Sequence, residues 1–154
     1  MLFDWVEYLT LAQRLATESG EASQRSAVSR AYYAAFHAAR SLLESTENFH
    51  VSQSNPAHKQ VWDAYRRKGR THTAVGINGD RLRLNRAHAD YDPEIENLSG
   101  LVEDSLEKAE RVFRYLDQIQ GAEFWPSVRC PLDCERSERL PAVAVSGAPA
   151  VVTV

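Results

Sequence analysis

The stretch "SRAYYAAFHAARSLLE", Ser29–Glu44, decides the fold that we predict for this chain. Apolar residues recur in and around it at spacings of three and four, which is typical of an amphipathic helix. The predicted core face consists of Val28, Ala31, Tyr32, Ala35, Phe36, Ala39, Leu42 and Leu43. Because many of these side chains are small, a second helix can approach closely. We therefore predict one long helix over about residues 21–45.

The same helical spacing continues on both sides of this stretch. It predicts a helix over about residues 4–19, a short one that Asn55 and Pro56 begin and Gly69 ends, one from Thr73 or later to Tyr91, and a last one that Asp92 caps and that ends near Gln120. Gly76 and Gly79 interrupt the start of the fourth helix. No strand-like alternation precedes Gly121, so we predict an all-α domain over residues 1–120.

After Gly121 the composition changes. Residues 121–154 carry four of the six prolines and no charge beyond Arg139, so we expect a mobile tail, with a strand-like or partner-docked ending as the alternative. Cys130 and Cys134 lie in this tail. We interpret them as reduced thiols, with a redox pair or half of a metal site as alternatives, because no further ligands stand nearby. No metal or cofactor is therefore expected.

The composition of the chain indicates an ordinary globular domain. It has 154 residues, 44% hydrophobic and 25% charged, with a formal net charge of -3. The first ten residues, "MLFDWVEYLT", have no basic region of the kind that opens a secretory signal. No apolar run reaches the roughly 20 residues that a membrane helix needs. We expect a cytoplasmic protein with no membrane partner.

The charges are unevenly distributed along the chain. Residues 59–88 contain eight basic and two acidic residues, a net charge of +6, whereas residues 1–58 stand at -2 and residues 89–120 at -6. Most of the eight are arginines, which suit planar, bidentate contact with phosphate. This distribution predicts a phosphate-binding surface. The alternative is that the arginines pair with the acidic last helix.

The segment "RLRLNRAHADY", Arg81–Tyr91, contains the candidate site. On a helix, Arg81, Asn85 and His88 share one face, and Leu84 and Tyr91 form a neighbouring apolar stripe. A fixed arginine can hold a phosphate, while an imidazole can take or give a proton near neutral pH. RNA supplies its own nucleophile, the 2′-hydroxyl, so such a site needs no metal.

Two stretches together resemble the HEPN family (higher eukaryotes and prokaryotes nucleotide-binding). "SRAYYAAFHAARSLLE" is similar to the second helix of that family, and "RAHADYDP", Arg86–Pro93, resembles the Arg-x-x-Ala-Asp-Tyr-Asp signature of a subgroup of small bacterial and archaeal members. The resemblance covers about residues 1–120. It implies a bundle of four to five helices, usually a homodimer, in which two Arg/His motifs meet across the dimer.

Many HEPN proteins are metal-independent ribonucleases. The resemblance implies His88 as the general acid or base, with Arg81 or Arg83 at the family's spacing as its catalytic partner. Arg86 matches the subgroup signature, and Asn85 would orient the phosphate or the imidazole. The catalytic motif often has a polar residue directly after its arginine, whereas a leucine follows Arg81 and Arg83 here.

HEPN toxins are often encoded beside a minimal nucleotidyltransferase antitoxin. Some of these antitoxins modify a toxin tyrosine two residues beyond the histidine, which makes Tyr91, three residues beyond His88, a candidate for modification. On the second helix, Arg30, Tyr33 and His37 share the face opposite the core and are candidates for RNA contact. For Tyr33 and His37 the alternative is packing at an interface.

Three functions follow from these features. The first is a metal-independent endoribonuclease, the toxin of a toxin–antitoxin pair, acting on RNA such as tRNA or mRNA. The second is a non-catalytic HEPN module that binds a nucleotide or a nucleotidyltransferase partner. The third is a dimeric helical adaptor whose basic segment pairs with its own acidic helix.

Overall fold

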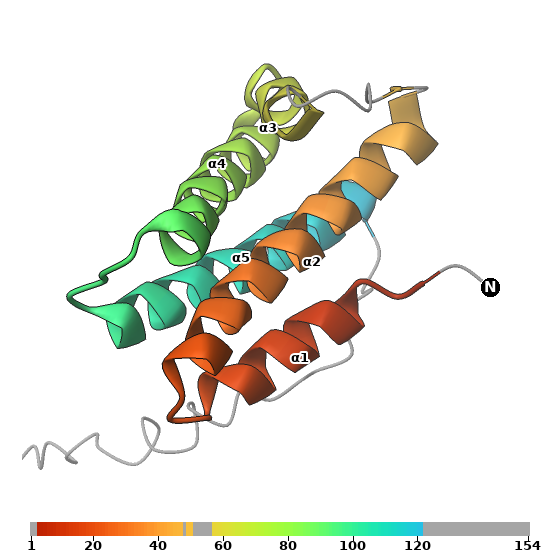
Figure 1. The fold of residues 1–154 in the computed structure, drawn as a ribbon. Helices are drawn as coiled ribbons and strands as arrows, with labels where there is room; N and C mark the ends of the chain where they lie inside the picture. Colours follow the sequence, from red (N-terminus) through yellow and green to blue (C-terminus); the bar gives the residue numbers. More distant parts are fainter. Residues whose placement is uncertain (1–2, 48, 51–56, 122–154) are drawn as a thin grey trace, which may run out of the picture.

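The computed structural model describes residues 3–47, 49–50 and 57–121, and this part of the chain is an all-α bundle (Figure 1). Its five helices are α1 (Val6–Ala16), α2 (Glu21–Glu47), α3 (Ala57–Arg66), α4 (Arg70–Tyr91) and α5 (Leu98–Gln120). Helices α1, α2, α4 and α5 lie side by side, and α3 packs on the N-terminal part of α4. The prediction of an all-α fold is confirmed.

Helix α2 is the centre of the bundle and contacts each of the other four helices. All eight residues of its predicted core face are buried. Ala27 and Ala34 are buried as well, which widens the buried surface beyond that face. The small residues let neighbouring helices pack on α2 from several directions, as the sequence predicted.

Helix α4 begins earlier than predicted and runs through Gly76 and Gly79 without interruption. Both glycines are buried where α3 packs on α4. A Cβ at position 76 would lie 2.6 Å from the carbonyl oxygen of Trp62, and one at position 79 would overlap the Trp62 ring. The glycines are therefore the positions of closest approach between two helices, which outweighs their low helix propensity.

The last helix begins later than predicted. Asp92 is not its cap but ends α4, with an extended backbone (ψ 130°) and its N–H bonded to the carbonyl of His88. Helix α5 is capped instead by Asn97, whose side-chain oxygen accepts a hydrogen bond of 3.0 Å from the N–H of Gly100. At the other end, Gly121 adopts the left-handed conformation (φ 64°) that commonly ends a helix.

Several expectations concern residues outside the described ranges. They are the mobile tail beyond Gly121, the state of Cys130 and Cys134, and the capping of α3 by Asn55 and Pro56. Within the described ranges, none of the five helices is long and apolar enough to cross a membrane.

Candidate functional site

Helix α4 carries most of the predicted site residues. Their side chains point toward different parts of the bundle. Val75, Leu82 and Ala89 are buried in the bundle. Asn85 points to α5, Arg86 lies over Tyr33 of α2, and Arg83 turns back toward Asp80. The predicted residues thus do not form one continuous surface on a single chain.

His88 lies at the C-terminal end of α4 beside the carboxylate of Asp92. Its Nδ1 is 3.3 Å from Oδ2 of Asp92, and the two side chains are 46% and 52% exposed. A carboxylate in this position orients the imidazole and leaves its other nitrogen, Nε2, to face a ligand. Asp92 was expected only to cap the last helix, so this pairing adds a candidate residue to the site.

Asn85 links α4 to α5. Its amide nitrogen donates hydrogen bonds of 2.8 Å to Asp104 and 3.0 Å to the hydroxyl of Ser105, which is fully buried. Burial opposes the ionisation of Asp104, but hydrogen bonds from Lys108 and Asn85 lower the pKa of that carboxyl overall. The side-chain amide of Asn85 therefore donates its hydrogen bonds to α5. The role of Asn85 in orienting a phosphate stays a prediction.

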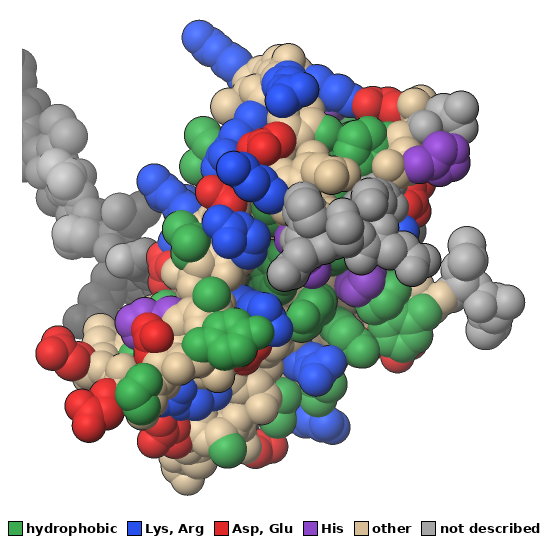
Figure 2. All heavy atoms as spheres, turned by 45° about the horizontal axis from the view of Figure 1, so that its top comes forward, with side chains coloured by type: hydrophobic (Ala, Val, Ile, Leu, Met, Phe, Trp, Pro, Cys, Tyr) green, Lys and Arg blue, Asp and Glu red, His purple; other side chains and the backbone are tan. Residues whose placement is uncertain are grey.

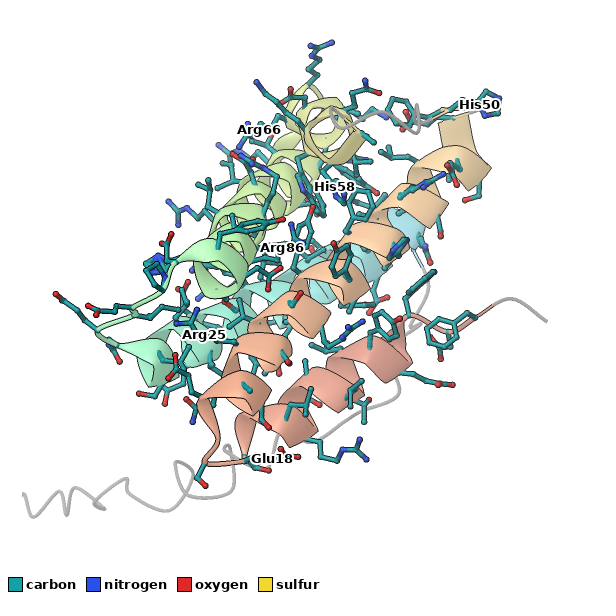
Figure 3. The ribbon with its side chains drawn as sticks, in the orientation of Figure 1. Glu18, Arg25, His50, His58, Arg66 and Arg86 are labelled. Carbon is teal, nitrogen blue, oxygen red and sulfur yellow. The ribbon has the colours of Figure 1, made fainter. Side chains whose placement is uncertain are left out.

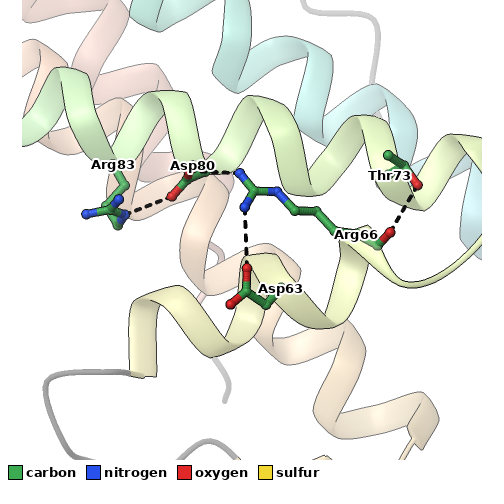
Figure 4. Close-up of polar contacts among 5 residues, drawn as sticks. All are labelled: Asp63, Arg66, Thr73, Asp80 and Arg83. Atoms are coloured by element: carbon green, nitrogen blue, oxygen red, sulfur yellow. Dashed lines mark hydrogen bonds and ion pairs between the residues drawn. The ribbon is translucent and has the colours of Figure 1, made fainter.

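The arginines of α4 have different surroundings. Arg83 donates a hydrogen bond of 3.0 Å to Asp80, which also accepts one of 2.7 Å from Arg66 of α3 (Figure 4). Burial opposes the ionisation of Asp80, yet the two arginines lower its pKa overall. In contrast, Arg81 is exposed and forms no ion pair within the described ranges. Its charge contributes to the lowered pKa of Asp104. Of the three arginines in the predicted site, Arg81, Arg83 and Arg86, Arg81 is thus the one whose charge is most available to a ligand.

The alternative interpretation of the basic segment was pairing with the acidic last helix. In the described part of the chain, the ion pairs of this segment go instead to Asp63, Asp80, Asp90 and Glu47. None of them reaches α5. Asp63 and Asp80 belong to residues 59–88, so Asp90 and Glu47 are the two ion-pair partners from outside this segment, and its net positive charge is only partly neutralised.

Arg86 belongs to an aromatic cluster between α2, α3 and α4 (Figure 3). Its guanidinium lies over the rings of Tyr33 and Tyr91, at 5.4 and 5.5 Å from their centroids. Its Nε is 2.6 Å from Asp90, but the angle is not that of a hydrogen bond, and Nε is buried without a hydrogen-bond partner in the described residues. Arg86, the residue that matches the subgroup signature, is thus held in place by its contact with Tyr33 of α2.

His58 of α3 lies in the same cluster. Its Nδ1 shares a hydrogen bond of 2.6 Å with the hydroxyl of Tyr32, and its ring packs 4.2 Å from that of Phe36. Burial, and then the charges of Arg86 and Arg83, lower the pKa of His58. No local sequence signal predicts this contact, because α2 and α3 meet only in the folded chain.

The two other candidates on α2 lie toward α1. His37 stacks on Trp5 with ring centroids 3.8 Å apart, and burial lowers its pKa. Arg30 lies over the ring of Tyr8 at 5.2 Å. Tyr33 is the candidate on α2 that contacts α4, through Arg86. Tyr91 is 70% exposed, and the guanidinium of Arg86 lies over its ring.

Arg25 of α2 holds the end of α4 in place (Figure 3). Its guanidinium donates hydrogen bonds of 2.8, 2.7 and 3.3 Å to the carbonyl oxygens of Ala89, Asp92 and Pro93. These three carbonyls follow His88 in the chain, and the hydrogen bonds hold the turn that carries Asp92. The sequence analysis missed Arg25, because its partners are backbone atoms more than sixty residues away along the chain.

The fold and the site define an all-α bundle with an exposed histidine–aspartate pair at the end of an arginine-rich helix. Comparison of the chain with protein-family models, with curated proteins and with solved structures gives no match. Among the described residues, no three His, Cys, Asp or Glu side chains are placed to hold a metal ion.

Proposed function

We propose that this protein is a metal-independent endoribonuclease of the HEPN type, in which His88 moves the protons. The observation that carries the proposal is the contact of His88 Nδ1 with Asp92 Oδ2 at 3.3 Å on an exposed surface. The resemblance of "RAHADYDP" to the family signature supports it.

The chemistry requires a base, an acid and a cation around one phosphate. His88 Nε2 takes the proton of the 2′-hydroxyl, and the resulting oxygen attacks the adjacent phosphorus while the bond to the 5′-oxygen breaks. The leaving 5′-oxygen takes a proton from water, which leaves a 2′,3′-cyclic phosphate and a 5′-hydroxyl, and the imidazolium of His88 returns its proton to solvent. Asp92 orients the imidazole, and an arginine stabilises the charge that develops on the phosphate, with Arg81 the best candidate since it has no ion pair in the described chain.

The biological setting that we propose is a toxin–antitoxin pair. The toxin acts as a homodimer on cellular RNA, and a minimal nucleotidyltransferase is its antitoxin. The exposure of the Tyr91 side chain supports a further proposal, that the antitoxin modifies this residue next to the active centre.

RNA cleavage in the presence of a chelator tests the proposal. Purified wild type, His88→Ala and Asp92→Asn are compared on the same RNA, with His50→Ala as a matched control because His50 is exposed and lies far from α4 in the sequence. We expect His88→Ala to lose at least about a hundredfold in rate, Asp92→Asn to lose less, and His50→Ala to match wild type. Equal activity of wild type and His88→Ala would exclude the catalytic role.

A second candidate function is a non-catalytic module that binds a nucleotide or a nucleotidyltransferase. It is favoured by the engagement of Arg83 with Asp80 and of Arg86 with Tyr33, which ties up two of the arginines near the histidine. Binding without cleavage, measured by nucleotide titration and by co-purification with the product of a neighbouring gene, would support it. Cleavage that depends on His88 would refute it.

A further inference from the structure

A groove of about 900 Å³ lies where the N-terminal end of α1 meets the second half of α2 and the C-terminal end of α5. Its large apolar lining residues are Phe3, Trp5, Val6, Leu42, Phe113 and Leu116. A concave apolar surface with a few polar groups is the usual form of a small-molecule site. Lysine and arginine side chains gather over α3 and α4 in Figure 2, and among the described residues that line the groove none belongs to these two helices. The groove is therefore separate from the basic surface of the molecule.

Aromatic side chains form a wall at the α1 end of the groove. His37 stacks on Trp5 with ring centroids 3.8 Å apart, and the ring of Phe3 meets that of Trp5 edge to face at 4.9 Å. Burial lowers the pKa of His37, so its imidazole is neutral at neutral pH and adds no positive charge to the lining. Because the faces of aromatic rings attract cations, this wall favours a positively charged ligand.

The charged residues that line the groove are three acids and one arginine, a net charge of -2. Two of the acids have partners: Glu44 accepts a hydrogen bond of 2.8 Å from Arg40, and Asp4 accepts one of 3.0 Å from the N–H of Val6. The third acid, Asp117 of α5, forms no hydrogen bond or ion pair with another described residue. Burial raises the pKa of this carboxyl, as expected for a carboxylate that loses water and gains no partner. Asp117 is therefore the acid of the groove that is open to a ligand.

We infer that the groove binds a small organic cation, a protonated amine on an apolar body, whose ammonium group donates to Asp117 while the body packs on the apolar lining. The net charge of the lining repels an anion, and a neutral apolar molecule would cover Asp117 without giving it a partner. An ammonium group supplies both the charge and the hydrogen-bond donors that a partly buried carboxylate needs. Charge complementarity thus selects the cation among ligands of the same shape.

The groove lies far from the candidate site along α5. Asn85 of α4 contacts α5 at Asp104, and Asp117 follows Asp104 by 13 residues, which is about 20 Å along the helix axis. The inference therefore goes beyond the proposed RNA cleavage and does not depend on it. His88→Ala should bind the cation as wild type does, whether or not the protein cleaves RNA.

The first test is an NMR titration of the full chain with three probes that share an aromatic ring and differ in charge. The probes are benzylammonium, benzyl alcohol and benzoate. We expect saturable binding of benzylammonium with a Kd on the order of 1 mM, binding of benzyl alcohol at least about tenfold weaker, and no binding of benzoate. Equal affinity for the cation and the alcohol, or no saturable binding of the cation, would overturn the inference.

The second test removes the charge of the acceptor. Asp117→Asn keeps the shape of the side chain, and we expect it to bind benzylammonium at least about tenfold more weakly than wild type, with unchanged helical circular dichroism. Glu103→Gln is the matched control, because Glu103 is an exposed acid of the same helix that does not line the groove. It changes the net charge equally and should bind as wild type does. Equal losses in the two variants, or full affinity in Asp117→Asn, would overturn the site.

The third test locates the bound cation. The ring resonances of Trp5 and His37 should shift as benzylammonium binds, because both rings line the groove. The indole resonances of Trp62, which is fully buried between α3 and α4, should stay unchanged and serve as the internal control. Shifts at Trp62 without shifts at Trp5 would place the cation elsewhere and overturn the inference.

The last test asks whether the groove holds protein instead of a small cation. Phe124→Ser and Trp125→Ser, made in the full chain, remove the two aromatic residues that follow Gly121 closely. We expect both variants to bind benzylammonium with wild-type affinity. Binding that appears only in these variants would assign the groove to that segment, and a dimer that dissociates in sedimentation equilibrium as the cation binds would assign it to a second copy of the chain. Either result would overturn the inference.

Discussion

The ring of Trp62 lies on Gly79, so close that a single methyl group at position 79 would overlap it. Trp62 is fully buried between α3 and α4, and Tyr65 of the same helix donates a hydrogen bond of 2.9 Å to the carbonyl of Ala39 in α2. The packing of α3 on the bundle therefore depends on Gly79, a residue type that disfavours helix when judged from the sequence alone.

Replacing Gly79 with alanine should destabilise the fold. The methyl group gains about 1 kcal/mol in helix propensity, but overpacking costs about 1–3 kcal/mol, and the rigid indole cannot move aside. We expect a net loss of stability in urea unfolding. Gly69→Ala is the control, because a Cβ there meets nothing within 4 Å, and its stability should be close to that of wild type.

Removal of the Arg25 side chain should loosen the turn that carries Asp92. Arg25→Met keeps the aliphatic stem but loses three hydrogen bonds to backbone carbonyls, at a cost of about 1–3 kcal/mol of local stability. Hydrogen exchange of the amides at 89–92 should accelerate, while Arg14→Met, an exposed control on α1, leaves it unchanged. Full protection in Arg25→Lys would contradict the interpretation, since an ammonium cannot span the three acceptors.

The amide of Asn85 should matter for stability. Asn85→Ala leaves the buried Ser105 hydroxyl without one partner and removes a donor from Asp104, at a cost of about 1–3 kcal/mol in thermal or urea unfolding. Asn78→Ala is the matched control, since among the described residues the side chain of Asn78 donates its hydrogen bond to the carbonyl of Ala74 in its own helix. An unchanged stability of Asn85→Ala with a loss of RNA cleavage would assign the residue to the site instead.

The charge of Arg86 should be visible in the titration of His58. Burial lowers the pKa of His58 first, and the Arg86 charge lowers it further. In Arg86→Gln, NMR titration should therefore show a higher pKa for His58, and the exposed control Arg70→Gln should show no change. An unaltered pKa in Arg86→Gln would mean that the charge is screened from the imidazole.

The same shift has a consequence for stability. Because the pKa of His58 in the folded chain lies below the ordinary histidine value of about 6.5, the unfolded chain binds more protons than the folded chain as the pH falls through that value. Stability should fall with pH in that window until His58 is protonated in the folded state as well. The fall that His58 contributes should be smaller in Arg86→Gln.

Much of the fold could be predicted from the sequence because its signals are local. The spacing of apolar residues in α2 predicted its eight core positions, all of which are buried. The predicted end of the fourth helix at Tyr91 is also correct, because Pro93 disfavours a helical backbone at the residue before it. The start of α4 was predicted wrongly because it depends on a distant partner: α3 packs on its glycines. The start of α5 was also wrong, but for a local reason, because Asn97 and not Asp92 caps that helix.

The sequence by itself determined the helical class, the core of α2 and the order of charged residues along α4. Helical phase, which is a property of one segment, also separated Arg83 and Arg86 from the face of Arg81 and His88. Only the tertiary structure decided which of these side chains form hydrogen bonds or ion pairs with other residues of the bundle. It turned Asn85 into a link to α5, brought His58 beside Tyr32, and left Ile77, Leu84 and Tyr91 uncovered. The reason is physical: periodicity fixes the direction of a side chain from its own helix axis, whereas its neighbours come from helices that are remote in the chain.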